Sequence, residues 1–155
     1  MIVVSDTSPV LNLARIGQAH LLCLLYRKIL VPRVVAEELT RNGADPRSIN
    51  CLLVREPVNK DAVLRLQSEL DSGESAAIVL ALEVGADLIL ADERKGRKKA
   101  TEMGLEVVGL LGVIGEAKRR GLIPACKPVL DALEKEARFW ISPRLRDRFL
   151  ALADE

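Results

Sequence analysis

Short apolar runs alternate with longer amphipathic segments along most of the chain. The short runs are rich in Val, Ile and Leu without a polar–apolar alternation, which is typical of strands buried on both faces of a parallel sheet. The longer segments repeat apolar residues three and four positions apart, a spacing that predicts helices with one buried face. The predicted strands are Ile2–Ser5, Ile29–Val31, Leu52–Arg55, Asp87–Ala91 and Glu106–Val108.

Turn-forming residues separate these segments and indicate where the helices begin and end. Ser8 suits the N-cap of the first helix, and Pro9 suits its first helical position, where a missing N–H costs no hydrogen bond. Gly17 ends that helix, the stretch Asn42–Asn50 is predicted to be a loop, and Asp71–Gly73 is predicted to be a break. The other predicted helices are Ala19–Arg27, Pro32–Arg41, Asp61–Leu70, Glu74–Val84, Glu93–Met103 and Leu110–Arg120.

This alternation of strands and helices predicts the fold class. Strands that alternate with helices form a parallel sheet covered by helices on both faces, which is an α/β fold. Beyond residue 123 the pattern predicts only helices, Ala125–Phe139 and Pro143–Ala153, the second capped by Ser142. We therefore expect an α/β domain over residues 1–123 and a C-terminal helical extension over 124–155 packed on the same domain.

Composition narrows the class of protein. The 155 residues are 49% hydrophobic and 29% charged, which excludes intrinsic disorder. Unbroken apolar stretches such as Leu21–Tyr26 are only a few residues long, too short to span a membrane. The N-terminus has no basic region and reaches Asp6 early, so we expect no signal peptide, no membrane partner and a cytoplasmic protein.

The residue types narrow the chemistry further. The three cysteines lie far apart and are expected to form neither a disulfide framework nor a metal motif. His20 is the single histidine, so zinc sites and Ser-His-Asp triads are disfavoured. Four aromatic residues are too few for a base-stacking platform of the RRM or OB type. Phe139, Trp140 and Phe149 are expected to pack in the core, with an interface as the alternative.

Charge is distributed unevenly although the net charge is +1. Residues 1–93 carry 9 basic and 13 acidic side chains, residues 94–120 carry 8 basic and 3 acidic ones, and residues 121–155 carry 6 of each. Residues 94–120 thus form a basic band, which has two interpretations of equal weight. It attracts a polyanion, or it forms the solvated faces of two helices.

Four acidic residues are candidates for a common site. In an open parallel sheet the ligand crevice lies beyond the carboxyl ends of the strands, where Asp6 and Asp92 each follow a strand. Glu38 borders the apolar stripe of its helix, whereas Glu37 has solvent-side ion-pair partners. Glu74 also borders an apolar face. The alternatives are structural: Asp6 in a turn, Asp92 as a helix cap, and Glu74 in a capping box with Asp71.

Four carboxylates at one sheet edge repel one another, and a hard divalent cation relieves that repulsion. Mg²⁺ or Mn²⁺ prefers carboxylate and water oxygens. Such an ion activates water and stabilises charge on a phosphate under in-line attack. This chemistry suits an enzyme that is short of histidine.

Four segments resemble the PIN-domain family and are most similar to its VapC-like toxin ribonuclease branch. They read VVSDTSPVLNLARIG, ILVPRVVAEEL, SGESAAIVLALEVGADLILADERKGRKKA and GLEVVGLLGVIGEAKRRGLI, and they are collinear over Met1–Ile123. The resemblance implies a three-layer α/β/α sandwich, metal-dependent endoribonuclease activity on RNA, a protein antitoxin and a homodimer. It assigns the catalytic and metal-binding acids to Asp6, Glu38, Glu74 and Asp92, the third of which is Asp in many PIN domains.

Other residues are expected to support this site. The resemblance places the hydroxyl of its D-x-S pattern on Ser8, and Asn12 lies one turn further along. Four basic residues follow Asp92 and are expected to steer the RNA backbone: Arg94, Lys95, Arg97 and Lys98.

Three other functions compete with the nuclease. A catalytically inactive PIN-like protein would bind nucleic acid or a partner without turnover. A haloacid-dehalogenase-type phosphotransferase needs a second Asp two residues after the first, where this chain has Ser8. A receiver-like module needs a lysine at a strand end, and no lysine is suitably placed.

Overall fold

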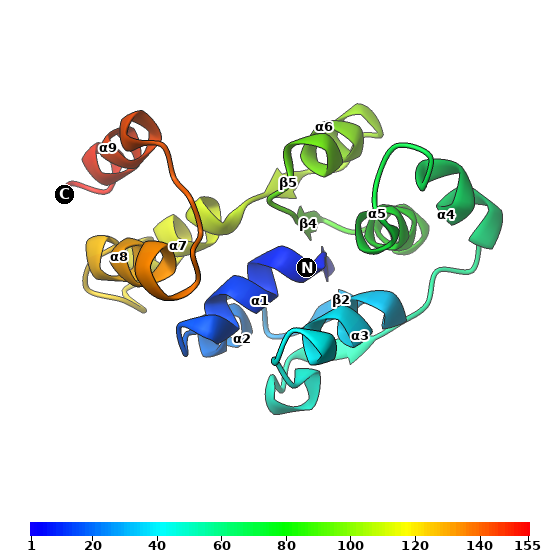
Figure 1. Cartoon of the computed structure of the whole chain (residues 1–155), viewed down its shortest axis with the longest axis horizontal. Coiled ribbons are helices and arrows are strands. Elements are labelled where there is room, and N and C mark those ends of the chain that lie inside the picture. The colour runs from blue at the N-terminus through cyan, green and yellow to red at the C-terminus, as the bar shows by residue number, and fades with distance from the viewer.

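A computed structural model describes residues 1–155 and contains one sheet of five parallel strands (Figure 1). The strands lie in the order β3-β2-β1-β4-β5, and every adjacent pair is parallel. The predicted parallel α/β fold is therefore confirmed. The strands are β1 (Val3–Ser5), β2 (Ile29–Val31), β3 (Leu52–Val54), β4 (Leu88–Leu90) and β5 (Val107–Val108).

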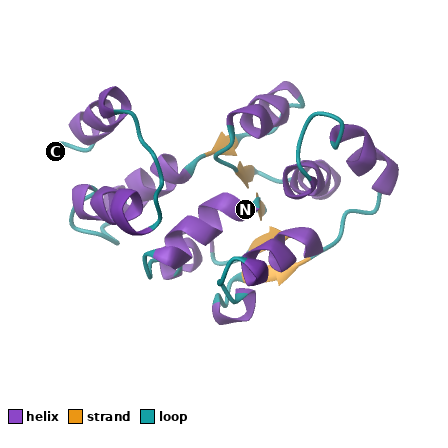
Figure 2. Cartoon of the chain, in the orientation of Figure 1, coloured by secondary structure: helices purple, strands orange, loops and turns teal.

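Nine α-helices surround this sheet, and Figure 2 shows helices on both sides of the strands. None of them is long and apolar enough to cross a membrane. They are α1 (Thr7–Arg15), α2 (His20–Tyr26), α3 (Arg33–Arg41), α4 (Lys60–Leu66), α5 (Ser72–Val84), α6 (Arg94–Glu102), α7 (Leu110–Arg119), α8 (Lys127–Glu136) and α9 (Pro143–Leu152).

Successive residues of β1 pack into different apolar clusters, because side chains of a strand point alternately to the two faces of a sheet. Val3 belongs to the larger cluster, which contains residues of α1, α2, α3, α7 and α8. Val4 belongs to the smaller one, with Ile78 of α5 and Ala100 of α6. The sheet is thus the middle of three layers, as the resemblance implied.

Two helices begin earlier than predicted. α1 begins at Thr7, so Asp6 occupies the N-cap position and the prediction that Ser8 caps this helix is wrong. α5 begins at Ser72 within the predicted break, because Asp71 caps it and forms a capping box with Glu74. Capping explains the early start of α5 only, because the Asp71 side chain accepts the Glu74 N–H, whereas the Asp6 side chain makes no capping hydrogen bond.

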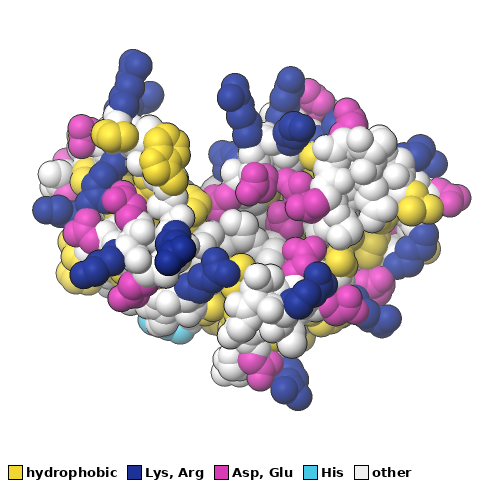
Figure 3. Space-filling view, in the orientation of Figure 1, with side chains coloured by type: hydrophobic (Ala, Val, Ile, Leu, Met, Phe, Trp, Pro, Cys, Tyr) yellow, Lys and Arg dark blue, Asp and Glu magenta, His cyan; other side chains and the backbone are white.

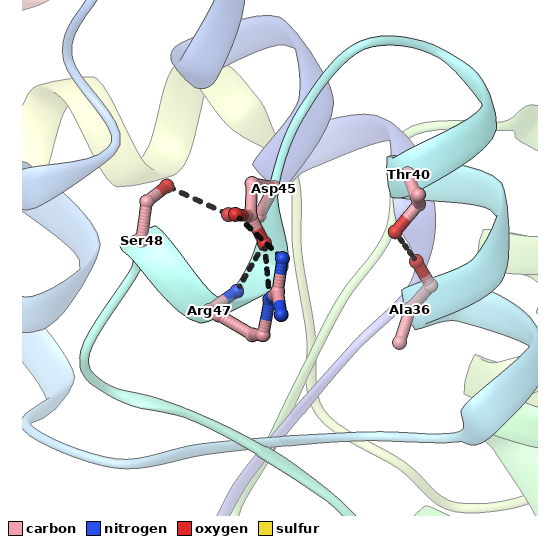
Figure 4. A network of polar contacts seen from close by, with 5 residues as sticks. All are labelled: Ala36, Thr40, Asp45, Arg47 and Ser48. Carbon is pink, nitrogen blue, oxygen red and sulfur yellow. Dashed lines mark hydrogen bonds and ion pairs between the residues drawn. The ribbon is translucent and has the colours of Figure 1, made fainter.

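The predicted loop between α3 and β3 is ordered by local hydrogen bonds (Figure 4). The Asp45 carboxylate accepts a hydrogen bond from the Arg47 backbone N–H at 2.9 Å and caps a short 3₁₀ turn at Pro46–Ser48. The Ser48 hydroxyl donates to the Asp45 carbonyl oxygen at 2.7 Å, and the Thr40 hydroxyl donates to the Ala36 carbonyl oxygen within α3. These bonds fix the direction in which the chain enters β3.

The C-terminal helices share the larger core. Leu130 and Leu133 of α8 are fully buried in the same cluster as the β1 residue Val3. Phe139 and Phe149 pack against this cluster as expected. Trp140 does not: 79% of its surface is exposed, so the expectation of core packing is wrong for this ring.

Cys23 and Cys51 form a disulfide, with their Cα atoms 5.2 Å apart, and the expectation that the cysteines form no disulfide is wrong. Cys23 lies on α2, which leads into β2, and Cys51 directly precedes β3, which pairs with β2. Strand pairing therefore brings together two residues that are 28 positions apart in sequence. Cys126 remains a buried free thiol.

We expect the disulfide to stabilise the fold by about 3 kcal/mol, because it closes a loop of intermediate length in the unfolded chain. Urea unfolding with and without dithiothreitol measures this difference. The double variant Cys23→Ser, Cys51→Ser should unfold at the midpoint of the reduced wild type and should not respond to dithiothreitol. Superimposable oxidised and reduced curves for the wild type would contradict the prediction.

Candidate active site

Two of the candidate acids lie side by side at the carboxyl edge of the sheet. Asp6 directly follows β1, and Asp92 follows β4 after one residue. The pairing of Ser5 with Leu90 sets the two strand ends level, and the Asp6 N–H extends it by donating to the Leu90 carbonyl oxygen at 3.0 Å. Asp6 is buried, with 5% of its surface exposed. Parallel pairing thus brings residues 6 and 92 to one edge.

Glu38 joins Asp6 at the first turn of α5. A Cβ added to Gly73 would lie 2.8 Å from Glu38 Oε1 and 3.1 Å from Asp6 Oδ1, so both carboxylates rest against this glycine. Thr7 donates a hydrogen bond of 2.7 Å to Glu38 Oε2, which leaves Oε1 turned toward Gly73. Glu37 is exposed. Of the two adjacent glutamates, Glu38 is therefore the one that faces the edge of the sheet.

Glu74 combines a structural role with an unpartnered oxygen. Its Oε1 accepts the Asp71 N–H at 3.2 Å, and its own N–H donates to Asp71 Oδ1 at 2.8 Å, so the capping box anticipated from the sequence is present. Its Oε2 is buried, has no hydrogen-bond partner and lies where a Cβ on Gly96 would clash with it. Capping therefore uses one oxygen of this carboxylate and leaves the other free.

The Asp92 carboxylate also has one oxygen that accepts a hydrogen bond and one that does not. Its Oδ1 accepts the Leu110 N–H at 2.8 Å from the start of α7, and its Oδ2 is buried without a partner. The N-cap of α6 is Glu93, so the alternative of Asp92 as the cap of this helix is not what the structure shows. Arg97 lies beside Asp92 and donates from Nη1 to the Ala91 carbonyl oxygen at 2.9 Å.

Burial disfavours the charged forms of three of these acids. The pKa of Asp6 is raised to about 7, mainly by burial and also by the charges of Asp71, Glu74 and Glu38, while a backbone hydrogen bond at Thr7 opposes the shift. Burial is also the main cause of the raised pKa of Glu74 and of Asp92. Three carboxylates, Asp6, Glu38 and Glu74, therefore share one electrostatic environment, while Asp92 responds to Arg97 and Glu93.

The remaining predicted site residues fall into two groups. Ser8 and Asn12 lie beside the acids and bond to each other, since Asn12 Nδ2 donates to Ser8 Oγ at 3.1 Å. Ser8 thus bonds Asn12 rather than Asp6. Arg94, Lys95 and Lys98 are exposed on α6, whereas Arg97 is half-buried. Figure 3 shows acidic side chains gathered beside this basic surface.

The donor set suits a hard divalent cation, although no three carboxylates converge closely enough to coordinate one ion. Mg²⁺ keeps several waters and is commonly bound through one or two carboxylates together with substrate phosphate oxygens. Glu74 Oε2 and Asp92 Oδ2 are buried acceptors without donors, a costly state that a cation relieves. The residues therefore fit a metal ion held with waters and not one enclosed by protein ligands alone.

Two supporting groups were not identified from the sequence. The Thr7 hydroxyl orients Glu38, and the Leu110 N–H orients Asp92. Thr7 stands between Asp6 and Ser8 and carries a hydroxyl, so its position was a usable signal. Nothing in the sequence indicated that the backbone of Leu110, 18 residues away, bonds Asp92.

Comparisons with known proteins bear on the family and the fold of this chain. A family model described as a PIN domain matches residues 2–155, which includes the C-terminal helices. The fold is similar to that of a PilT N-terminus domain protein from the hyperthermophilic archaeon Sulfolobus solfataricus P2, with a TM-score of 0.55 and 20% sequence identity. That similarity covers 76% of this chain and 93% of the archaeal one. No curated protein sequence matches the chain.

Proposed function

Because this chain belongs to the PIN-domain family, whose members are generally nucleases, we propose that it is a metal-dependent endoribonuclease that hydrolyses RNA phosphodiester bonds. One observation carries the proposal. Glu38, Glu74 and Asp92 each have one carboxylate oxygen held by a protein donor, and the second oxygens of Glu74 and Asp92 are buried without a partner. Orienting donors of this kind are characteristic of carboxylates that ligate a metal.

Asp6, Glu38, Glu74 and Asp92 would hold Mg²⁺ or Mn²⁺ directly or through waters. A bound divalent cation supplies positive charge to the phosphate and lowers the pKa of water. The chain itself supplies orientation: Thr7, Asp71 and Leu110 hold three carboxylates in place before substrate arrives. The exposed Arg94, Lys95 and Lys98 attract the RNA backbone, and the half-buried Arg97 places a positive charge beside Asp92.

The cellular role that we propose is the toxin of a toxin–antitoxin pair in the cytoplasm. Its partners would be the RNA substrate, a protein antitoxin and a second copy of the chain in a homodimer. These partners rest on the similarity of the sequence to VapC-like proteins. Size-exclusion chromatography with light scattering tests the dimer separately from the activity.

Cleavage of a mixed-sequence RNA tests the activity. We expect cleavage in Mg²⁺ or Mn²⁺, no cleavage in EDTA, and recovery when the metal is restored. Glu38→Gln should slow cleavage by at least about tenfold, the lower limit typical of losing a group that orients a metal ligand. The matched control is Glu37→Gln, which changes the adjacent exposed glutamate and should leave the rate unchanged. Cleavage that persists in EDTA would contradict the mechanism.

A second function, binding without turnover, is favoured by one observation. No three carboxylates converge on a single point, which is the arrangement that an inactive PIN-like scaffold would tolerate. Such a protein would bind RNA or a partner and would not cleave RNA in either metal. The assay above distinguishes the two functions when RNA binding is measured in the same samples.

A further inference from the structure

Trp140 is the single tryptophan of the chain, and it is held at the surface by its neighbours. Phe139 packs against the larger core, and its N–H donates to the Leu133 carbonyl oxygen at 2.9 Å. Ile141 is 6% exposed, and Ser142 then caps α9. Trp140 therefore projects from a short segment that is anchored on both sides, with 79% of its surface exposed. Tryptophan is highly buried on average, so this exposure is unusual for the residue type and leaves the ring accessible to a ligand.

The ring lies on the wall of a groove that reaches the candidate active site. The groove has a volume of about 830 Å³, and its lining includes Asp92, Ser8 and Asn12 as well as Trp140. Figure 3 shows hydrophobic side chains of the C-terminal helices across a hollow from the acidic and basic side chains beside α6. A chain that enters the acidic edge of the sheet can therefore continue along the groove past the aromatic ring.

The charges of the groove favour a nucleic acid as the occupant. Arg15, Arg97 and Arg138 line it together with the aromatic segment. Aromatic rings beside basic side chains are the combination that binds single-stranded RNA, because bases stack on the ring while cations contact phosphates. An apolar protein segment would instead have to bury these guanidinium groups against itself, at a cost in desolvation.

We propose that Trp140 stacks on a nucleobase of single-stranded RNA, a few nucleotides from the phosphate that lies beside Asp92, with Arg138 and Arg15 contacting the intervening backbone. This inference rests on the proposed function and adds a positioning residue for its substrate. The ring contacts the base face, so the subsite accepts any base and contributes affinity rather than sequence specificity.

Tryptophan fluorescence tests the base subsite at Trp140 directly, because Trp140 is the single tryptophan and gives all of the tryptophan emission. The Asp6→Asn protein in Mg²⁺ is titrated with an oligouridylate of twelve nucleotides and, separately, with inorganic polyphosphate of similar charge. Stacking predicts quenching by the RNA and none by polyphosphate. An unchanged signal with the RNA overturns the proposal and leaves the groove to a protein partner.

Affinity for the same oligonucleotide, labelled and followed by fluorescence anisotropy, tests the energetic contribution. Trp140→Ala should weaken binding by roughly ten- to a hundredfold, and Trp140→Phe should retain most of the affinity because it keeps a ring. The control is Leu152→Ala, which removes another exposed apolar side chain of the C-terminal region, 84% exposed in the wild type. Equal affinities for the wild type and Trp140→Ala overturn the proposal.

Different results would contradict the proposed nuclease activity and the proposed base subsite at Trp140. If RNA is cleaved but Trp140→Ala leaves affinity and KM unchanged, the nuclease stands and the base subsite is wrong. If RNA quenches Trp140 but is never cleaved, the subsite stands and the chain is an RNA-binding protein. Because Trp140 is largely exposed, its replacement leaves folding intact and a loss of binding is not a loss of structure.

Discussion

Replacing Asp6 by Asn is expected to slow RNA cleavage by about 10³-fold while leaving the protein folded. The carboxylate follows β1, is 5% exposed and lies against the same glycine as Glu38. Asparagine has the same shape, so the packing survives, but the charge that would hold the cation is lost. Removal of one preorganised electrostatic group from an active site typically costs about 10²–10³ in rate, and a direct metal ligand belongs at the upper end.

Single-turnover cleavage in saturating Mg²⁺ measures this effect, and circular dichroism checks the fold of each variant. Asp61→Asn makes the same chemical change on the exposed surface of α4 and should cleave at the wild-type rate. An Asp6→Asn protein that keeps more than about a tenth of the wild-type rate would remove Asp6 from the catalytic machinery.

The stability of the metal-free protein is expected to fall as pH rises, and Asp6 is the main cause. Its pKa is raised to about 7 in the folded protein from 3.8 in the unfolded chain. The folded state therefore binds a proton that the unfolded state has released, so the contribution is complete below pH 3.8 and is lost as pH rises through about 7. A shift of this size corresponds to about 4 kcal/mol.

Comparison with Asp6→Asn isolates this contribution. The free energy of unfolding is measured by urea unfolding at several pH values in EDTA. The variant and the wild type should have equal values near pH 4, and the variant should be more stable by about 4 kcal/mol at pH 8. Added Mg²⁺ should reduce the difference in stability between the two proteins at pH 8, because a ligand that binds only the folded wild type stabilises the wild type. Parallel pH curves for the two proteins would show that Asp6 titrates normally.

Asp6 is thus expected to lower the stability of the metal-free protein and to be required for its activity. Buried carboxylates that repel one another destabilise the metal-free fold at neutral pH, and the same arrangement creates the negative site that a cation needs. Sites that carry function commonly show this cost. The most stable variant at Asp6 is therefore expected to be the least active.

The fold was largely predictable because its signals are local. The apolar runs that form β1, β2 and β4 carry no alternation, and the helices between them carry Gly or Pro near their ends, so element types followed from neighbouring residues. The errors also have local causes. Asp71 caps α5 and moves its start, and α1 begins at Thr7, so that Ser8 lies in the first turn of α1.

The candidate site was less predictable from the sequence than the fold. The position of Asp6 and Asp92 after two strands placed them at one edge, and helical periodicity separated Glu38 from Glu37. Periodicity could not show that Trp140 is exposed between two packed neighbours, because residues 138–142 form no regular element. The Cys23–Cys51 disulfide was missed for a related reason, since strand pairing brings together cysteines that show no motif in sequence.

By itself the sequence determined the class of fold, the order of its strands and helices along the chain, and the acids available at the ends of the strands. These properties depend on hydrophobic period, caps and turn residues, which act over a few positions. Only the tertiary structure decided which oxygens of Glu38 and Asp92 accept a hydrogen bond, because the donors, Thr7 and Leu110, lie on separate segments. A carboxylate has two equivalent oxygens until a distant hydrogen bond distinguishes them.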